Sequence, residues 1–154
     1  MTDIHVDPSE AGDIVLIVRR TIRASVGRVF EAWTKPEHLR RWWGPASVRC
    51  PEAEVDLRVG GGYRIANELP DGNVLWIAGE FEVVSPPHKL VYTWRLGPGT
   101  PASERVTVRF EPKEGATEVI VVHERIADRV ARVTHEQGWL GCLDGLAAFL
   151  EGEA

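Results

Sequence analysis

The fold is decided by the last stretch of the sequence, ARVTHEQGWLGCLDGLAAFL, which runs from Ala131 to Leu150. Its apolar positions recur every three or four residues, as one face of an amphipathic helix requires, at His135, Trp139, Cys142, Leu146 and Phe149 or Leu150. Glycines at 138, 141 and 145 would each weaken an isolated helix by up to ~1 kcal/mol relative to alanine. Packing must therefore stabilise this helix, and the glycines let another surface approach its backbone. We predict a helix clasped by a curved sheet.

The composition is that of one globular domain. A chain of 154 residues can bury roughly 70% of its unfolded surface, enough for a real core. The hydrophobic share of 44% and the charged share of 27% are ordinary for such a domain. Residues 1–13 are polar and show no periodicity, so we expect a flexible tail there. The single domain is expected to span residues 14–154.

Charge and hydropathy narrow the classes of partner. The net charge is −5 without a basic run, which argues against a nucleic-acid partner. No apolar stretch approaches ~20 residues, and the first residues are polar, so neither a membrane span nor a signal peptide is expected. We therefore expect a cytoplasmic protein. Cys50 and Cys142 form no CxxC pair and are expected to be reduced thiols. No cofactor motif is present.

The preceding chain predicts one strand, two short helices and a run of strands. Residues 14–22 alternate as a strand does. Ser25 can cap a helix whose apolar face is Val26, Val29, Phe30 and Trp33, and Pro36 suits the start of a second helix ending at Gly44-Pro45. A period of two begins after Glu52, so strands are then expected at 56–59, 63–68, 74–84, 90–94, 105–111 and 117–124, joined by turns. The order β-α-α-β(5–6)-α indicates an α+β fold with an antiparallel meander under the final helix.

Ordered motifs along the chain match those of a known family. They are Arg20-x-Ile22-x-Ala24-Ser25-x-x-x-Val29-Phe30-x-Ala32-Trp33-Thr34-x-Pro36-Glu37, Trp42-Trp43-Gly44-Pro45, Val55-Asp56-Leu57-Arg58-x-Gly60-Gly61, Gly79-x-Phe81, Pro87-x-x-Leu90 and His135-x-x-Gly138-Trp139-x-x-x-Leu143-x-x-Leu146. Through them the chain resembles the START-like, Bet v 1-type (SRPBCC) superfamily, and within it the group named after the activator of Hsp90 ATPase. The resemblance implies a helix-grip fold, with a cavity between a curved antiparallel sheet and a long C-terminal helix.

The same resemblance limits what can be carried over. The superfamily shares no catalytic residues, so none is implied for this chain. The eukaryotic co-chaperone that named the group has an additional N-terminal domain, for which 154 residues leave no room. Activation of Hsp90 is therefore not expected.

The aromatic residues are the candidate ligand site. They either fill the core or, in a partly hollow fold, line a pocket of roughly 300–1,000 Å³. With two histidines and a cysteine, the candidate lining is Trp42, Trp43, Tyr63, Trp76, Tyr92, Trp94, His123, His135, Trp139 and Cys142. Polar atoms of tryptophan and tyrosine would orient an aromatic or lipid-like guest. The adjacent pair Trp42-Trp43 could form a flap, with Trp43 inside and Trp42 nearer the mouth, or could only fasten the short helices to the sheet.

Three residues are candidates for acid–base chemistry. His123 and His135 lie on the predicted inner faces and can titrate near neutrality. Glu80 is a buried carboxylate if its strand turns it inward, and a solvated one otherwise. A zinc site from His123, His135 and Cys142 lacks local metal spacing, so no metal is expected.

A second group of motifs is assigned a structural role. Gly60-Gly61-Gly62 lacks the lysine of a phosphate loop and predicts a bend of the sheet. Asp56 and Arg58 share one face of a strand and are expected to pair with Arg20 or a loop amide.

These features favour a non-enzymatic binder of a small hydrophobic molecule. The alternatives are a cyclase- or hydrolase-type enzyme that uses inward His or Glu, and a protein-interaction module related to chaperone regulation. The cavity discriminates among them. An apolar cavity favours the binder, two titratable groups converging in a cavity favour the enzyme, and a closed core favours the interaction module.

Overall fold

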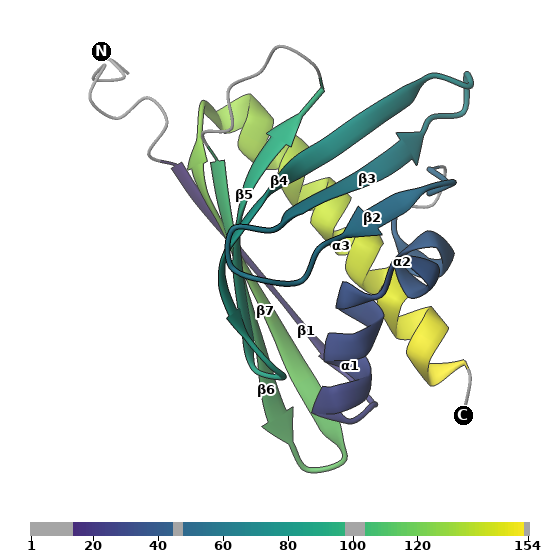
Figure 1. Cartoon of the computed structure of the whole chain (residues 1–154), viewed down its shortest axis with the longest axis vertical. Helices are drawn as coiled ribbons and strands as arrows, with labels where there is room; N and C mark the ends of the chain where they lie inside the picture. Colours follow the sequence, from purple (N-terminus) through teal and green to yellow (C-terminus); the bar gives the residue numbers. More distant parts are fainter. Residues whose placement is uncertain (1–13, 45–47, 98–103, 153–154) are drawn as a thin grey trace.

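One curved antiparallel sheet wraps around a long helix in the computed structural model, which describes residues 14–44, 48–97 and 104–152 (Figure 1). The sheet order is β1-β7-β6-β5-β4-β3-β2. Its strands are β1 (Ile14–Ile22), β2 (Ala53–Val55), β3 (Gly62–Glu68), β4 (Val74–Ser85), β5 (Lys89–Leu96), β6 (Glu104–Lys113) and β7 (Ala116–Ile126). The helices are α1 (Val26–Thr34), α2 (Pro36–Trp42) and α3 (Arg129–Glu151). The predicted α+β helix-grip fold is confirmed.

The helices begin where the sequence places their caps. The hydroxyl of Ser25 accepts a hydrogen bond from the backbone N–H of Arg28 at 3.3 Å, and Pro36 opens α2. Helix α3 starts slightly before the apolar stripe, because the carboxylate of Asp128 accepts from the N–H of Ala131 at 2.8 Å. No helix in the described ranges is long and apolar enough to cross a membrane. The expected tail at 1–13, Pro45 and loop residues 98–101 lie outside the described residues.

The segment between β2 and β3 differs from what the sequence predicts. Strand β2 ends at Val55, so Asp56 and Arg58 lie in a turn rather than on one face of a strand. There they pair with each other, with the Arg58 Nε atom 3.1 and 2.9 Å from the two carboxylate oxygens. Arg20 instead pairs with Asp144 of α3. Gly60 and Gly61 lie in the segment that joins β2 to β3, where a Cβ on Gly61 would lie 2.1 Å from the carbonyl oxygen of Asp56.

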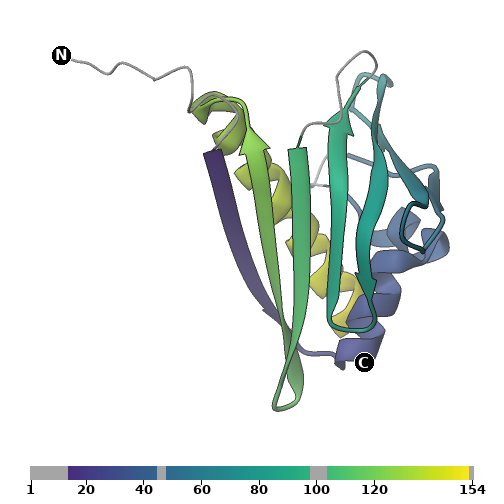
Figure 2. The ribbon, with the colours of Figure 1, turned by 60° about the vertical axis from the view of Figure 1, so that its left-hand side comes forward.

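Helix α3 lies along the concave face of the sheet, and α1 and α2 flank its C-terminal half (Figures 1 and 2). A Cβ on Gly145 would lie only 2.5 Å from the carbonyl oxygen of Trp42 at the end of α2. Glycine at this position therefore permits the close approach of the two helices. Gly138, earlier on the same helix, has no such neighbour, because a Cβ there would meet nothing within 4 Å.

These two glycines provide a matched test of the helix packing. We expect Gly145→Ala to lower the free energy of unfolding by about 1–3 kcal/mol, because the added methyl group overlaps a backbone carbonyl. Gly138→Ala should raise it by up to ~1 kcal/mol, through helix propensity alone. Urea unfolding of both variants measures the difference. Equal stabilisation by the two substitutions would contradict the close approach of α2 to α3.

Candidate functional site

The centre of the space between sheet and helix is filled by aromatic rings. The ring centroid of Trp139 lies 6.0 Å from that of Trp33, 5.6 Å from that of Trp43 and 5.5 Å from that of Trp94. The cavity remaining beside Trp33, Tyr63 and Tyr92 has a volume of only about 20 Å³, close to the minimum for one water molecule. This part of the predicted pocket is therefore solid core.

Both tyrosines belong to this core. The Tyr63 hydroxyl donates to the carbonyl oxygen of Thr93 at 2.7 Å, and the Tyr92 hydroxyl accepts from the Trp33 indole at 3.4 Å. Burial raises the pKa of both phenols, so both stay neutral. They pack and position their neighbours.

An apolar pocket of about 240 Å³ lies beside this core, between the N-terminal half of α3 and strands β3, β4 and β5. Its walls include Trp43, Leu69, Ile77, Trp94, Gly138 and Trp139. The half-exposed Leu75 and Leu96 and the exposed Thr134 mark its mouth. The candidate ligand residues Trp43, Trp94, His135, Trp139 and Cys142 all line this pocket.

Asn67 is a polar residue of the pocket wall that the sequence analysis missed. Its side-chain oxygen accepts from the Trp43 indole at 2.9 Å, and its amide nitrogen donates to the carbonyl oxygens of Ile65 and Leu75 at 3.1 and 3.2 Å. Both ends of the amide are thus occupied within the protein. Period-two counting along β3 from Tyr63 and Ile65 would have placed Asn67 on the inner face.

The two adjacent tryptophans have different roles. Trp43 lines the pocket, whereas Trp42 is buried away from it, and its indole N–H donates to the carbonyl oxygen of Ala32 at 2.9 Å. The Trp43 indole bonds to Asn67 of β3 and the Trp42 indole to α1, so the geometry favours a role of the pair in fastening α2 to the sheet and to its neighbouring helix. The mouth between Leu75, Leu96 and Thr134 lies elsewhere.

Titratable side chains from three elements converge at the edge of the pocket. Nε2 of His123 on β7 lies 2.7 Å from Oε1 of Glu104 on β6, and Nε2 of His135 on α3 lies 3.1 Å from the same oxygen. The two imidazole rings stack, with centroids 4.5 Å apart and planes inclined by 16°. We refer to Glu104, His123, His135 and Trp139 as the Glu104 cluster. Of these, only Glu104 escaped the sequence analysis, although Val106, Val108 and Phe110 share its face of β6.

Hydrogen bonds assign the protons of this cluster. The indole Nε1 of Trp139 lies 3.0 Å from Nδ1 of His123, and an indole N–H can only donate. Nδ1 of His123 therefore accepts, and its Nε2 carries the proton that it donates to Glu104. The carboxylate is likewise an acceptor for the Nε2 proton of His135.

The charges follow from these bonds. Burial raises the pKa of Glu104, but the hydrogen bonds from His123 and His135 outweigh it and bring the pKa to about 2. Burial lowers the pKa of the fully buried His123, against the opposing effect of its bond to Glu104. At neutral pH an ionised carboxylate thus accepts from a neutral His123.

The ligand atoms of Glu104, His123 and His135 lie within 4.8 Å of one another, close enough to hold a metal ion. Two histidines and one carboxylate are a known donor set for iron, but each nitrogen must offer a lone pair. Nε2 of His123 offers none, because the bond from Trp139 fixes the proton there. The cluster does not fit a divalent metal in this arrangement.

Cys142 lies outside this cluster, in contrast to the zinc set considered from the sequence. Burial raises the pKa of its thiol to about 12, so it is protonated and apolar at neutral pH. Cys50 is also a free, buried cysteine. Cys142 contributes to the pocket wall and supplies neither a nucleophile nor a metal ligand.

Glu80 and Trp76 lie on the opposite face of the sheet. Ile77 and Phe81 of β4 point inward and are buried, so alternation along the strand places residues 76, 78 and 80 outward. Glu80 is exposed, and the half-buried Trp76 ring is covered by the Arg64 guanidinium at 4.4 Å from its centroid. Of the two orientations considered for Glu80, the structure has the solvated one, and Trp76 does not reach the cavity.

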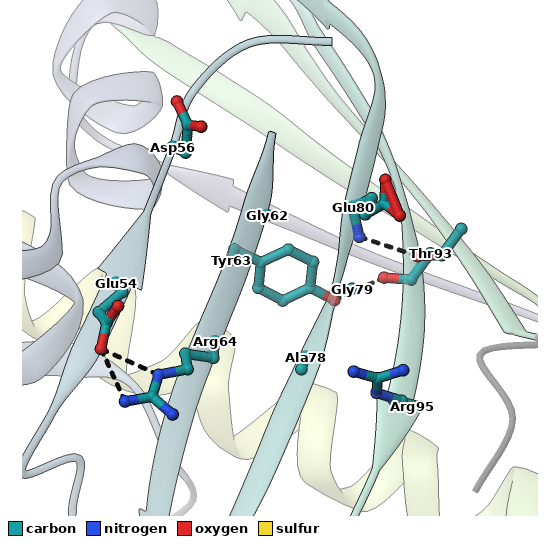
Figure 3. Close-up of a pocket in the computed structure, with 10 residues that line it drawn as sticks. All are labelled: Glu54, Asp56, Gly62, Tyr63, Arg64, Ala78, Gly79, Glu80, Thr93 and Arg95. Carbon is teal, nitrogen blue, oxygen red and sulfur yellow. Dashed lines mark hydrogen bonds and ion pairs between the residues drawn. The ribbon is translucent and has the colours of Figure 1, made fainter. Parts of the chain in front are cut away.

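Glu80 borders a groove of about 480 Å³ on this outer face, which is larger than the apolar pocket (Figure 3). The groove arises where Gly62, Ala78 and Gly79 carry little or no side chain. Five exposed charged residues border it, Glu54, Asp56, Arg64, Glu80 and Arg95, and Arg64 already pairs with Glu54 at 2.8 Å. Charged residues make up half of this lining, whereas apolar side chains predominate around the inner pocket, so the inner pocket is the better small-molecule site.

Comparison with known proteins agrees with the geometry. The sequence model of the family described as "Activator of Hsp90 ATPase homolog 1-like protein" matches residues 23–151. A protein of known structure from Chromobacterium violaceum is 27% identical, with a TM-score of 0.81 over 89% of this chain and 96% of that one. The AHSA1 protein from Silicibacter pomeroyi is 26% identical, with a TM-score of 0.78 over 92% and 100% of the two chains.

A protein from Nitrosomonas europaea, at 23% identity and a TM-score of 0.79 over 96% of this chain and 98% of that one, shares the fold. No protein of curated function matches the chain.

The protonation of the Glu104 cluster predicts how stability depends on pH. The pKa of Glu104 is about 2 in the folded state against an ordinary value of 4.5, so the unfolded chain binds more protons as pH falls through this window. The free energy of unfolding should therefore fall between pH 4.5 and pH 2. The lowered pKa of His123 adds an earlier loss as pH falls through 6.5.

Urea unfolding of Glu104→Gln and wild type at several pH values measures this effect. We expect the variant to lose roughly 1–3 kcal/mol at pH 7, as for a hydrogen bond to a charged group, and to lose less on acidification below pH 4.5. Glu80→Gln, at an exposed position, is the matched control and should follow wild type. If both variants show the wild-type acid dependence, the assignment of an ionised, hydrogen-bonded Glu104 is wrong.

Proposed function

This chain belongs to the activator of Hsp90 ATPase homolog 1-like family, of the START-like, Bet v 1-type superfamily. From that premise we propose that it binds a small hydrophobic molecule in the apolar pocket. The observation that carries the proposal is the pocket of about 240 Å³ between α3 and the sheet, walled by tryptophan and aliphatic side chains. Concave, mostly apolar sites with few polar groups are the usual form of small-molecule sites.

The volume of the pocket sets the size of the guest. An engineered apolar cavity of ~150 Å³ holds benzene, so a pocket of about 240 Å³ suits a ligand of one or two rings or a short aliphatic chain. The indole rings of Trp43, Trp94 and Trp139 favour an aromatic body, because offset or edge-to-face ring pairs add to the burial of apolar surface.

The enzyme alternative rests on one observation, the convergence of Glu104, His123 and His135 beside the pocket. Of these three residues, only His135 belongs to the pocket wall. The thiol of Cys142 is held protonated by burial, so the wall offers no activated nucleophile. A single basic group without a partner nucleophile supports binding better than turnover.

Filling the pocket should abolish binding. We expect 1-aminonaphthalene, an uncharged two-ring fluorophore, to bind wild type at one saturable site with a blue shift of its emission. Gly138→Leu should remove this signal, because Gly138 lines the pocket and its added side chain has open space to enter. Fluorescence titration measures the loss.

Gly27→Leu is the matched control, since Gly27 is an exposed glycine of α1 whose Cβ would also meet nothing within 4 Å. It should bind the probe as wild type does. Unaltered binding by a folded Gly138→Leu variant would place the probe elsewhere and contradict the proposal. If the probe binds in the pocket, native mass spectrometry of protein purified from its natural source would identify the natural ligand.

A further inference from the structure

The polar groups of the pocket wall are almost all occupied by the protein itself. Asn67 uses both ends of its amide, and the Thr134 hydroxyl donates to the carbonyl oxygen of Val130 at 3.2 Å. The indole N–H groups of Trp43 and Trp139 donate to Asn67 and His123. Two ring nitrogens of the wall have no hydrogen-bond partner among the described residues, Nδ1 of His135 and Nε1 of Trp94.

The first of these nitrogens is an acceptor. The Nε2 proton of His135 is directed at the carboxylate of Glu104, 3.1 Å away, which leaves a lone pair on Nδ1 in the neutral ring. The His135 side chain is only 14% exposed, and it lines the pocket. The negative charge of Glu104 increases the electron density of the imidazole, as in other carboxylate–histidine pairs.

The second nitrogen is a donor. Nε1 of Trp94 is buried and unpaired, which is unfavourable for a polar group of this kind. The Trp94 ring lines the same pocket, and its centroid lies 6.3 Å from that of His135. The wall of the pocket therefore contains one unpaired acceptor and one unpaired donor on neighbouring aromatic rings.

We propose that the ligand is an aromatic alcohol of one or two rings, whose hydroxyl donates to Nδ1 of His135 and accepts from Nε1 of Trp94. This inference rests on the proposed function and names the chemical class of its ligand. A hydroxyl is the smallest neutral group that donates and accepts through one atom. The aromatic body lies against Trp43 and Trp139 in the remaining volume of the pocket.

Other functional groups fit these two nitrogens less well. A ketone or an ether can accept from Trp94 but cannot donate to His135. An ammonium group donates but cannot accept, and a carboxylate only accepts and is repelled by the ionised Glu104. An aromatic hydroxyl is more acidic than an aliphatic one, so it donates more strongly to an imidazole. Glu104 acts here as a positioning residue, because it fixes the tautomer of His135.

Three bicyclic probes separate the two hydrogen bonds. Naphthalene makes neither bond, 2-methoxynaphthalene can accept from Trp94, and 2-naphthol can also donate to His135. We expect affinities, measured at pH 7.5 by displacement of 1-aminonaphthalene, to rise in this order. Each step should be roughly 2- to 10-fold, the fold-change that corresponds to a net hydrogen bond of ~0.5–1.5 kcal/mol.

Variants assign each step to its residue. His135→Phe should remove the difference in affinity between 2-naphthol and its methyl ether, because the acceptor of the hydroxyl proton is lost. Trp94→Phe should remove the difference between the ether and naphthalene. Glu104→Gln should reduce only the preference for 2-naphthol, a change in specificity that a purely structural role would not produce. Gly27→Leu is again the control.

The outcomes separate the two proposals. Equal affinity of wild type for all three probes would overturn the aromatic-alcohol inference and leave the hydrophobic site standing. Failure of every probe, 1-aminonaphthalene included, to bind folded wild type would overturn the proposed function itself. If His135→Phe did not fold, the order of affinities on wild type would still decide whether a hydroxyl is preferred.

Discussion

The hydrogen bond from the Trp139 indole to Nδ1 of His123 is the contact on which the rest of the interior depends. It joins the long helix to the sheet at a distance of 3.0 Å, between two fully enclosed side chains. Breaking it would leave a buried donor and a buried acceptor unpaired, at about 1–3 kcal/mol each. The bond holds α3 at a fixed distance from β7. It also sets the tautomer of His123, whose Nε2 proton therefore points at Glu104. The charge state of the cluster is thus a consequence of core packing.

The same helix explains why the interior is solid in one place and hollow in the next. Trp139 lies at the centre of the space between α3 and the sheet and packs on Trp33, Trp43 and Trp94. Gly138 precedes it, rotated by about 100° around the helix axis, and adds no side chain to the space in front of it. A large residue and a missing side chain at consecutive positions close the core on one side and leave the apolar pocket on the other.

Much of this arrangement can be predicted from the sequence, because it follows from periodicity. The alternation of β6 and β7 and the stripe of α3 place His123, His135 and Trp139 on facing surfaces. Residue type and strand register give different answers at two positions, and the structure follows the register. Trp76 was assigned to the pocket because it is hydrophobic, yet Ile77 occupies the inward position next to it. The charge of Glu104 favours an exposed position, yet counting back from Val106 places it on the inner face.

An ionised carboxylate so near an apolar pocket restricts what the pocket can hold. Glu104 is stabilised as an anion by two imidazole donors, at a depth where water screens charge weakly. Fatty acids and phospholipids carry their own negative charge at the polar end, which would lie beside Glu104 if that end reached His135. Either the guest is neutral at that end, or its charged group faces the mouth near Thr134. The hydrophobic guest expected from the sequence, aromatic or lipid-like, is therefore narrowed to a neutral one at the end that meets the histidine.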